Sequence, residues 1–184
     1  MKTFSEEEIC NVIWGLEPNK APGPEDFSIH FYRACWEIIK GDLLRMIKAF
    51  QQKSKVGAGS TNSTHLTLIP KEANPGSFDR FKPISLCNAS YKILAKLMAN
   101  IIKPLLGKLI SPSQSGLVKG RHILDNVIQV QEAMHSSHQR KEQGMLIKLD
   151  MANAFNSVKL SLIYRVLRAF GFNYDFAILI KACT

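Results

Sequence analysis

A short apolar run that ends on a carboxylate constrains the fold more than any other feature of this sequence. The run comprises Met145, Leu146, Ile147 and Leu149. Its length and composition are typical of a buried strand, and Asp150 follows directly. A turn and a helix over about 160–170 are expected next, and a carboxylate between strand and helix lies where open α/β sheets bind ligands. By position alone, an aspartate such as Asp150 more often caps a turn or helix than binds a metal.

Most of the remaining chain is predicted to be helical. Ser5 and Glu8 form a capping-box pattern at the start of a helix that ends before Pro18. Further helices are expected over about 28–39, 42–52, 88–109 and 122–139, with a break or kink at Pro104. Residues 65–71 alternate as a strand, 54–64 read as a flexible connection, and 74–85 read as irregular.

Basic residues are concentrated in one part of the chain. The formal net charge is +9, and the segment from Arg80 to Leu124 carries eight Lys and Arg residues and no Asp or Glu. Such a segment favours contact with nucleic-acid phosphates. The alternative is an ordinary solvated helix face. No apolar run reaches the roughly 18 to 20 residues that a membrane-spanning helix needs, so no membrane partner is expected.

The cysteines indicate an intracellular protein. The four of them lie far apart and form no C-x-x-C pair. Neither a zinc site nor a disulfide framework is therefore predicted. Reduced thiols of this kind are typical of an intracellular location.

Several segments together resemble a known family. "KLDMANAFNSV" resembles the first palm motif of reverse transcriptases, in which an apolar strand is followed by Asp, four residues and an aromatic. It is preceded, in order, by "NKAPGPEDFSIHFY", "LIPK", "FKPISLCNASYKILAKLMANII" and "QSGLVKGRHILDNV". This order resembles the polymerase of plant non-LTR (LINE-type) retrotransposons over nearly the whole chain, from about Phe4 to Cys183.

The resemblance implies an α+β fold. It would be a partial right-hand polymerase fold with helix-rich fingers and the first strand-helix unit of the palm. Residues 1–60 would be a helical extension before the fingers, and residues 61–184 would be the fingers and the beginning of the palm. The implied activity is RNA-directed DNA polymerase, with an RNA template, a DNA primer or target, deoxynucleoside triphosphates and Mg²⁺. A complete enzyme of this kind would act in the nucleus. The sequence predicts no oligomeric state.

The resemblance also implies roles for residues of the palm motif. Asp150 would be the catalytic ligand of both magnesium ions, and the carbonyl of Met151 would assist one of them. The amides of Asn153 and Ala154 would face the triphosphate. Phe155 would lie under the deoxyribose and exclude a 2′-hydroxyl; without the motif it would be assigned to the core.

Residues before the palm motif would bind nucleotide and template. Lys71 and Lys82 would neutralise the triphosphate. The basic helix after Ser90 would lie near template and nucleotide, as would the loop that holds Gln114, Gly116 and Arg121. The Pro-rich loop over residues 20–27 would belong to the extension, which in this family is associated with the template strand.

The chain departs from the family pattern at several positions. Pro24, Glu25 and Asp26 replace the usual Pro-Asp-Gly, so a strained or rearranged turn is expected. Lys82 stands where Arg is usual, and its ammonium cannot make the bidentate hydrogen bonds to a phosphate that a guanidinium makes. Asn156 stands where most LINE-type relatives carry an acidic residue.

The second palm motif, an aromatic followed by paired Asp, is not found in the sequence. Tyr174 and Asp175 lie too close to Asp150 and lack the second acid. One of three metal-binding carboxylates is therefore present, and a truncated chain without catalytic activity of its own is expected. The alternatives are a non-catalytic nucleic-acid-binding remnant of a decayed element and a chain that does not fold alone, because half a palm sheet leaves an unpaired edge.

Overall fold

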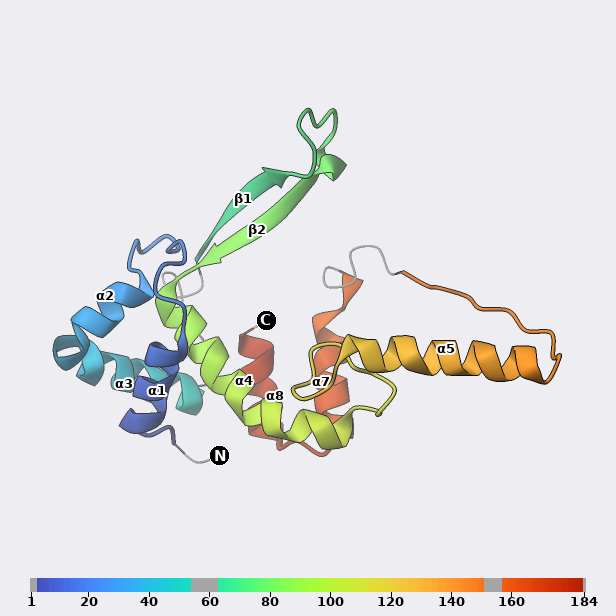
Figure 1. The fold of residues 1–184 in the computed structure, drawn as a ribbon. Coiled ribbons are helices and arrows are strands. Elements are labelled where there is room, and N and C mark those ends of the chain that lie inside the picture. The colour runs from blue at the N-terminus through green and yellow to red at the C-terminus, as the bar shows by residue number, and fades with distance from the viewer. Residues whose placement is uncertain (1–2, 54–62, 151–156, 184) are drawn as a thin grey trace. The chain divides into compact units, whose positions relative to one another are not determined.

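The computed structural model describes residues 3–53, 63–150 and 157–183. The chain divides into two compact units. The first unit contains residues 1–98 together with 164–184, and the second contains residues 99–163. Figure 1 labels the helices and strands along the chain.

The first unit begins with three helices. Helix α1 spans Glu6–Gly15 and starts with the predicted capping box, in which Ser5 and Glu8 each accept a hydrogen bond from the other's backbone N–H. Helices α2 (Ile29–Ala34) and α3 (Trp36–Lys53) are separated at Cys35, several residues before the expected break. Trp36 is buried and packs edge-on against Trp14, with ring centroids 5.9 Å apart. This contact fixes the start of α3, and Gly41 lies inside the helix despite its low propensity.

Two antiparallel strands form a ribbon in the first unit. Strand β1 (Thr64–Pro70) confirms the predicted strand, and β2 (Phe81–Cys87) pairs with it from Thr64↔Cys87 to Pro70↔Phe81. A 3₁₀ turn, η1 (Phe78–Arg80), precedes β2. The expectation of irregular structure over 74–85 was wrong for β2. Pro83 is tolerated because each strand of a two-stranded ribbon has an outer edge on which a missing N–H costs no ladder bond.

Helix α4 spans Ala89–Leu109 and continues unbroken through Pro104. Pro104 removes the hydrogen bond to the carbonyl of Asn100, and Asn100 is exposed, so water can satisfy that carbonyl instead. The predicted break is therefore absent. Although α4 is long, no helix in the described part of the chain is both long and apolar enough to span a membrane.

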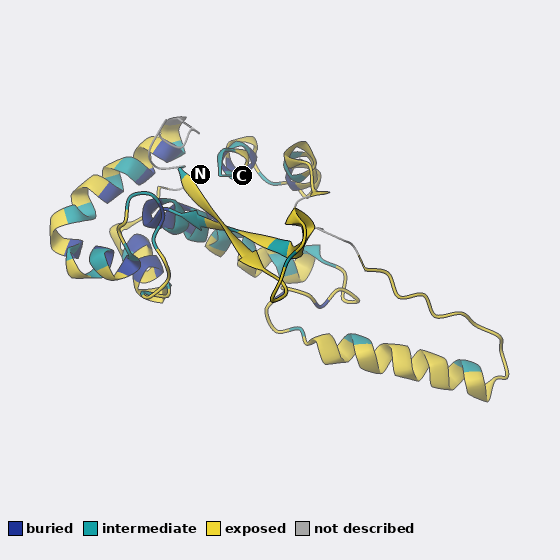
Figure 2. Cartoon of the chain, turned by 90° about the horizontal axis from the view of Figure 1, so that it is seen from above, coloured by how far each residue is buried: buried dark blue, intermediate teal, exposed yellow. Residues whose placement is uncertain are grey.

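The core of the first unit is built from helices. Helix α7 (Leu160–Ala169) is followed by Gly171 at φ +84°, the predicted helix stop, and α8 (Tyr174–Ala182) comes next. Buried side chains come from α1, α2, α3, α4 and α8, with Leu167 from α7 (Figure 2). The most deeply buried apolar ones are Ile9, Ile13, Ile47, Ile93, Leu94, Met98 and Leu179.

The second unit buries little apolar surface. Helix α5 spans Ile123–Gln139, as predicted, and none of its residues is buried. Among the described residues of this unit, only Ser115 and Val118 are buried. Residues 145–149 form no strand and are exposed (Figure 2), with Met145 at 84% and Leu149 at 86%. The predicted buried strand is thus contradicted, because a strand needs a neighbour to hydrogen-bond with and no described segment pairs with this one.

Candidate nucleic-acid interface

Asp150 follows residues 145–149, which are exposed and form no strand. Its carboxylate makes no hydrogen bond or ion pair with any other described residue. An exposed, unengaged carboxylate is a ligand of the kind that Mg²⁺ prefers. The part of the chain that the structure describes holds no group of three or more His, Cys, Asp or Glu that could bind a metal. Asp150 therefore fits as one ligand of a magnesium site that needs further groups.

The other palm-motif residues lie outside the described residues. These are Met151, Asn153, Ala154, Phe155 and Asn156. The roles that the resemblance implies for the first four stay predictions.

The β1–β2 ribbon brings Lys71 and Lys82 together. Lys82 is opposite Ile69 in the ladder, and the N–H of Lys71 bonds to the carbonyl of Arg80 one pair beyond the end of β1. Because side chains alternate along a strand and opposite residues share a face, Lys71, Arg80 and Lys82 lie on the same side of the ribbon. All three side chains are exposed. The Lys71 ammonium donates a hydrogen bond to the carbonyl of Asp79 at 2.8 Å, and the Arg80 guanidinium lies 3.5 Å from the Glu72 carboxylate. Of these three cations, Lys82 alone makes no contact with another polar group of the described chain, and it is the one best suited to a phosphate.

The Pro-rich loop is anchored at the joint between β2 and α4. The side-chain oxygen of the fully buried Asn88 accepts a hydrogen bond from the N–H of Glu25 at 3.0 Å. The hydroxyl of Ser90 donates to the Glu25 carboxylate at 3.3 Å, and the ammonium of Lys92 donates to the carbonyl of Ala21 at 3.0 Å. Glu25 thereby places a negative charge at the N-terminus of α4, where the helix dipole favours it.

The turn in this loop has the strain that the missing glycine predicts. Asp26 has φ +56°, a left-handed conformation that glycine adopts freely and aspartate adopts at a modest cost. Burial, together with the charge of Glu25, raises the pKa of Tyr32, despite a hydrogen bond with Ser90 that lowers it. Sequence reasoning missed Asn88 as an anchor. The signal available was a polar residue next to the first buried residues of α4.

Arg121 binds the C-terminal end of α4 through its guanidinium. Its guanidinium donates hydrogen bonds to four backbone carbonyls, those of Gly107, Ile110, Ser111 and Gln114. A cation at this end of a helix satisfies orphan carbonyls and complements the helix dipole. Arg121 thus fixes residues 111–121 against α4, and most of its donors are occupied by the chain itself.

Replacing Arg121 by lysine is expected to lower the free energy of unfolding by about 1 kcal/mol, because one ammonium cannot serve four carbonyls. Urea denaturation followed by circular dichroism measures the change. Lys119→Arg, two residues away, is the matched control and should leave stability unchanged. Equal stability of Arg121→Lys and wild type would contradict the capping role.

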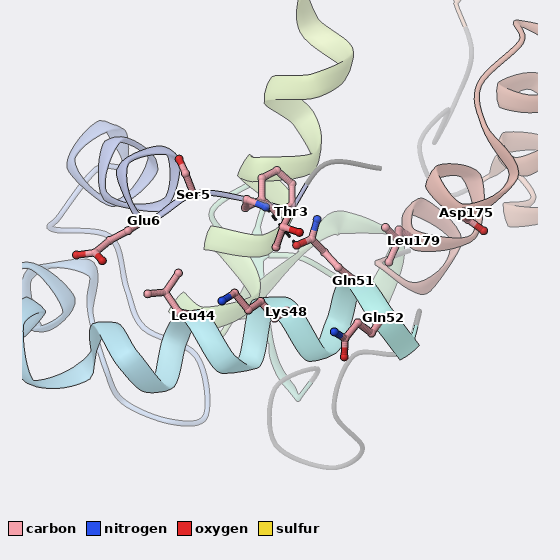
Figure 3. A pocket seen from close by; sticks show the side chains of 10 residues that line it. Thr3, Ser5, Glu6, Leu44, Lys48, Gln51, Gln52, Asp175 and Leu179 are labelled. Carbon is pink, nitrogen blue, oxygen red and sulfur yellow. Dashed lines mark hydrogen bonds between the residues drawn. The ribbon is translucent and has the colours of Figure 1, made fainter.

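A pocket of about 860 Å³ lies within the first unit. Figure 3 shows it between the N-terminal segment, α3 and α8, with Lys48, Gln51 and Asp175 among the residues that line it. The side-chain oxygen of Gln51 accepts a hydrogen bond from the N–H of Phe4 at 3.3 Å. None of the predicted site residues that lie within the described ranges lines this pocket.

The chain is similar to known proteins over most of its length. Residues 69–184 match the family model described as reverse transcriptase (RNA-dependent DNA polymerase). Over 170 residues the chain is 27% identical to the Transposon TX1 uncharacterized 149 kDa protein of Xenopus laevis, covering 92% of this chain and 13% of that protein.

A second relative is the Retrovirus-related Pol polyprotein from type-1 retrotransposable element R2 of Popillia japonica. It is 24% identical over 171 residues, which are 92% of this chain and 23% of that protein. The chain thus corresponds to a small part of each of these relatives. The family match covers well over half of the chain and includes β2, α4 and Asp150. The chain therefore belongs to the reverse transcriptase (RNA-dependent DNA polymerase) family.

Proposed function

We propose that this chain supplies the fingers and the first metal-binding carboxylate of an RNA-directed DNA polymerase of a non-LTR retrotransposon. The observation that carries the proposal is the family match over residues 69–184, which includes β2, the basic helix α4 and Asp150. Both relatives named above are proteins of mobile elements and support the same assignment. The resemblance of the motifs to plant elements supports a plant source. A site of action in the nucleus would follow from the activity of a complete enzyme of this kind.

The proposed metal site would use Asp150 and the carbonyl of Met151. Bound magnesium ions would stabilise the charge that develops when a primer hydroxyl attacks the α-phosphate of a nucleotide. The carboxylate of Asp150 contributes a hard oxygen ligand and charge that is not already neutralised within the described chain. At least one more carboxylate is needed to hold two ions.

The chain's own cations would bind the substrates. Lys71 and Lys82, on one side of the ribbon, would contact a triphosphate, for which the Lys71 ammonium would exchange its hydrogen bond with the Asp79 carbonyl. Lys103, on α4, is exposed and available to phosphates of the template. Arg121 contributes by holding the loop that contains Gln114 and Gly116, since its guanidinium is bound to four carbonyls.

Neutralising two of these cations tests the nucleic-acid interface. Lys82→Gln combined with Lys103→Gln should flatten the dependence of log K on log salt by about 1 for each phosphate that is no longer neutralised. Fluorescence anisotropy with a labelled single-stranded RNA, measured at several salt concentrations, gives the slope.

The matched control removes two cations elsewhere. Replacing Lys40 and Arg45, on α3, by Gln lowers the net charge by the same amount as the first double variant. Both residues already pair with carboxylates of the chain, Lys40 with Glu37 and Arg45 with Asp42, so neither is expected to contact RNA phosphates. This control should leave the slope nearly unchanged. If both double variants flatten the slope alike, binding depends on overall charge and not on the ribbon and α4.

A second candidate function is supported by the charge distribution alone. Eight basic residues and no acidic one between Arg80 and Leu124 would suffice for a non-catalytic nucleic-acid-binding protein. The two proposals predict the same salt slope and differ in whether Asp150 has a catalytic effect.

A further inference from the structure

Leu117 combines an unfavourable backbone conformation with almost complete exposure. Its φ is +62°, in the left-handed region, and its side chain is 90% exposed. Single exposed leucines are common on protein surfaces and need no explanation. A leucine in the left-handed region is different, because its Cβ crowds the backbone and no burial of its side chain offsets the cost.

The loop around Leu117 is held firmly. Ser115 and Val118, on either side of it, are both buried. The N–H of Arg121 bonds to the carbonyl of Val118 at 3.2 Å, and its guanidinium ties the start of the loop to the end of α4. Strained residues persist where the surrounding structure determines their conformation in this way. The loop therefore holds the Leu117 side chain out into solvent.

The positive charge of the residues near Leu117 indicates which kind of partner would cover its side chain. Lys119 follows two residues later, and within the same unit residues 99–124 include Lys103, Lys108, Lys119 and Arg121 and no acidic residue, the next one along the chain being Asp125. A protein or lipid surface could cover a leucine, but a surrounding segment with positive charge alone favours a polyanion. Apolar side chains that nucleic-acid-binding proteins present among cations pack against the faces of bases or enter between them.

We propose that Leu117 is an apolar wedge that packs against the faces of unpaired bases in a single strand of nucleic acid. The inference rests on the proposed function, since it assumes that the basic segment contacts a strand. In this role Leu117 would separate neighbouring bases without distinguishing one base from another. The buried neighbours Ser115 and Val118 hold the wedge in place and offset the backbone strain at Leu117.

Leu117→Gly separates binding from folding, because glycine adopts φ +62° without strain. The variant should melt at the wild-type temperature or above it, and should bind single-stranded RNA about tenfold more weakly, in keeping with the loss of one partly buried leucine. An RNA that contains 2-aminopurine reports base stacking. Wild type should raise its fluorescence, and Leu117→Gly at saturating concentration should not.

Leu66→Ala is the matched control, since Leu66 is 65% exposed on β1. It should retain both the affinity and the fluorescence change. Equal affinity and equal fluorescence change for Leu117→Gly and wild type would overturn the wedge, while the salt slope of the lysine variants would still support the proposed function. If wild type fails to bind RNA at all, both proposals fall.

Discussion

Replacing Asp150 by asparagine is expected to lower primer extension by about a thousandfold in a polypeptide that joins this segment to the rest of a polymerase palm. Asparagine keeps the size of the side chain but removes the charge that would hold magnesium. Several kcal/mol of transition-state stabilisation come from such a metal, and about 1.4 kcal/mol corresponds to a factor of ten in rate. Single-turnover extension on an RNA template with a DNA primer measures the loss.

Asp175→Asn is the matched control for this experiment. Asp175 follows Tyr174 and so resembles part of the second palm motif, but it lies in the first turn of α8. Its loss should cost stability by less than about 1 kcal/mol and leave the rate unchanged. The 184-residue chain by itself should extend no primer. Magnesium-dependent extension by that chain, abolished by Asp150→Ala, would contradict the expectation that one carboxylate is insufficient.

If Asp150→Asn leaves the rate of the complete polymerase unchanged, the catalytic proposal is wrong. The charge-based alternative would then account for the chain, because it assigns Asp150 no chemical role. Loss of RNA affinity together with rate would instead indicate a folding defect. Anisotropy measured on the same samples separates these outcomes.

Replacing Gly23 by alanine is expected to lower the free energy of unfolding by about 3 kcal/mol. A Cβ at this position would lie 2.5 Å from the backbone N of Asn88, 2.5 Å from the carbonyl carbon of Cys87 and 2.6 Å from the Asn88 side-chain oxygen. Two of these atoms belong to the backbone, which cannot rotate away. The loop must shift, and the fully buried Asn88 then loses its bond to Glu25.

Denaturation followed by the fluorescence of Trp14 and Trp36 reports this change, since both lie in the first unit. For a chain of this length the melting temperature should fall by about 6–12 °C. Gly15→Ala is the control, because no atom lies within 4 Å of the added Cβ. A change at Gly23 as small as the one at Gly15 would show that the loop is not packed on α4.

Features set by neighbouring residues could be predicted from the sequence. The capping box of Ser5 and Glu8, the stop at Gly171 and the strained turn at Asp26 depend on contacts within a few positions. The strand expected at 145–149 depends on a partner that the described residues do not supply. Strand β2 was missed because Pro83 forbids a central strand and is permitted in a two-stranded ribbon.

The same distinction applies to the candidate site. Lys71 and Lys82 lie on one side of the ribbon because of the register in which β1 pairs with β2. The sequence pattern alone does not show that these two segments pair, and so it cannot give their register. The bond between Glu25 and Asn88 joins residues 63 positions apart, so no local pattern reveals it. Nor could the spacing of Arg121 from Gln114 show that its guanidinium binds four carbonyls.

The anchoring of the Pro-rich loop has a consequence for any shortened form of this protein. The predicted boundary at residue 60 separates Glu25 from Asn88, which the structure joins by a hydrogen bond in the interior. A chain that began at residue 61 would leave the Asn88 amide without that donor and the first turn of α4 without a nearby negative charge. Removing the first 60 residues would thus remove the contacts that residues 21–25 make with the start of α4.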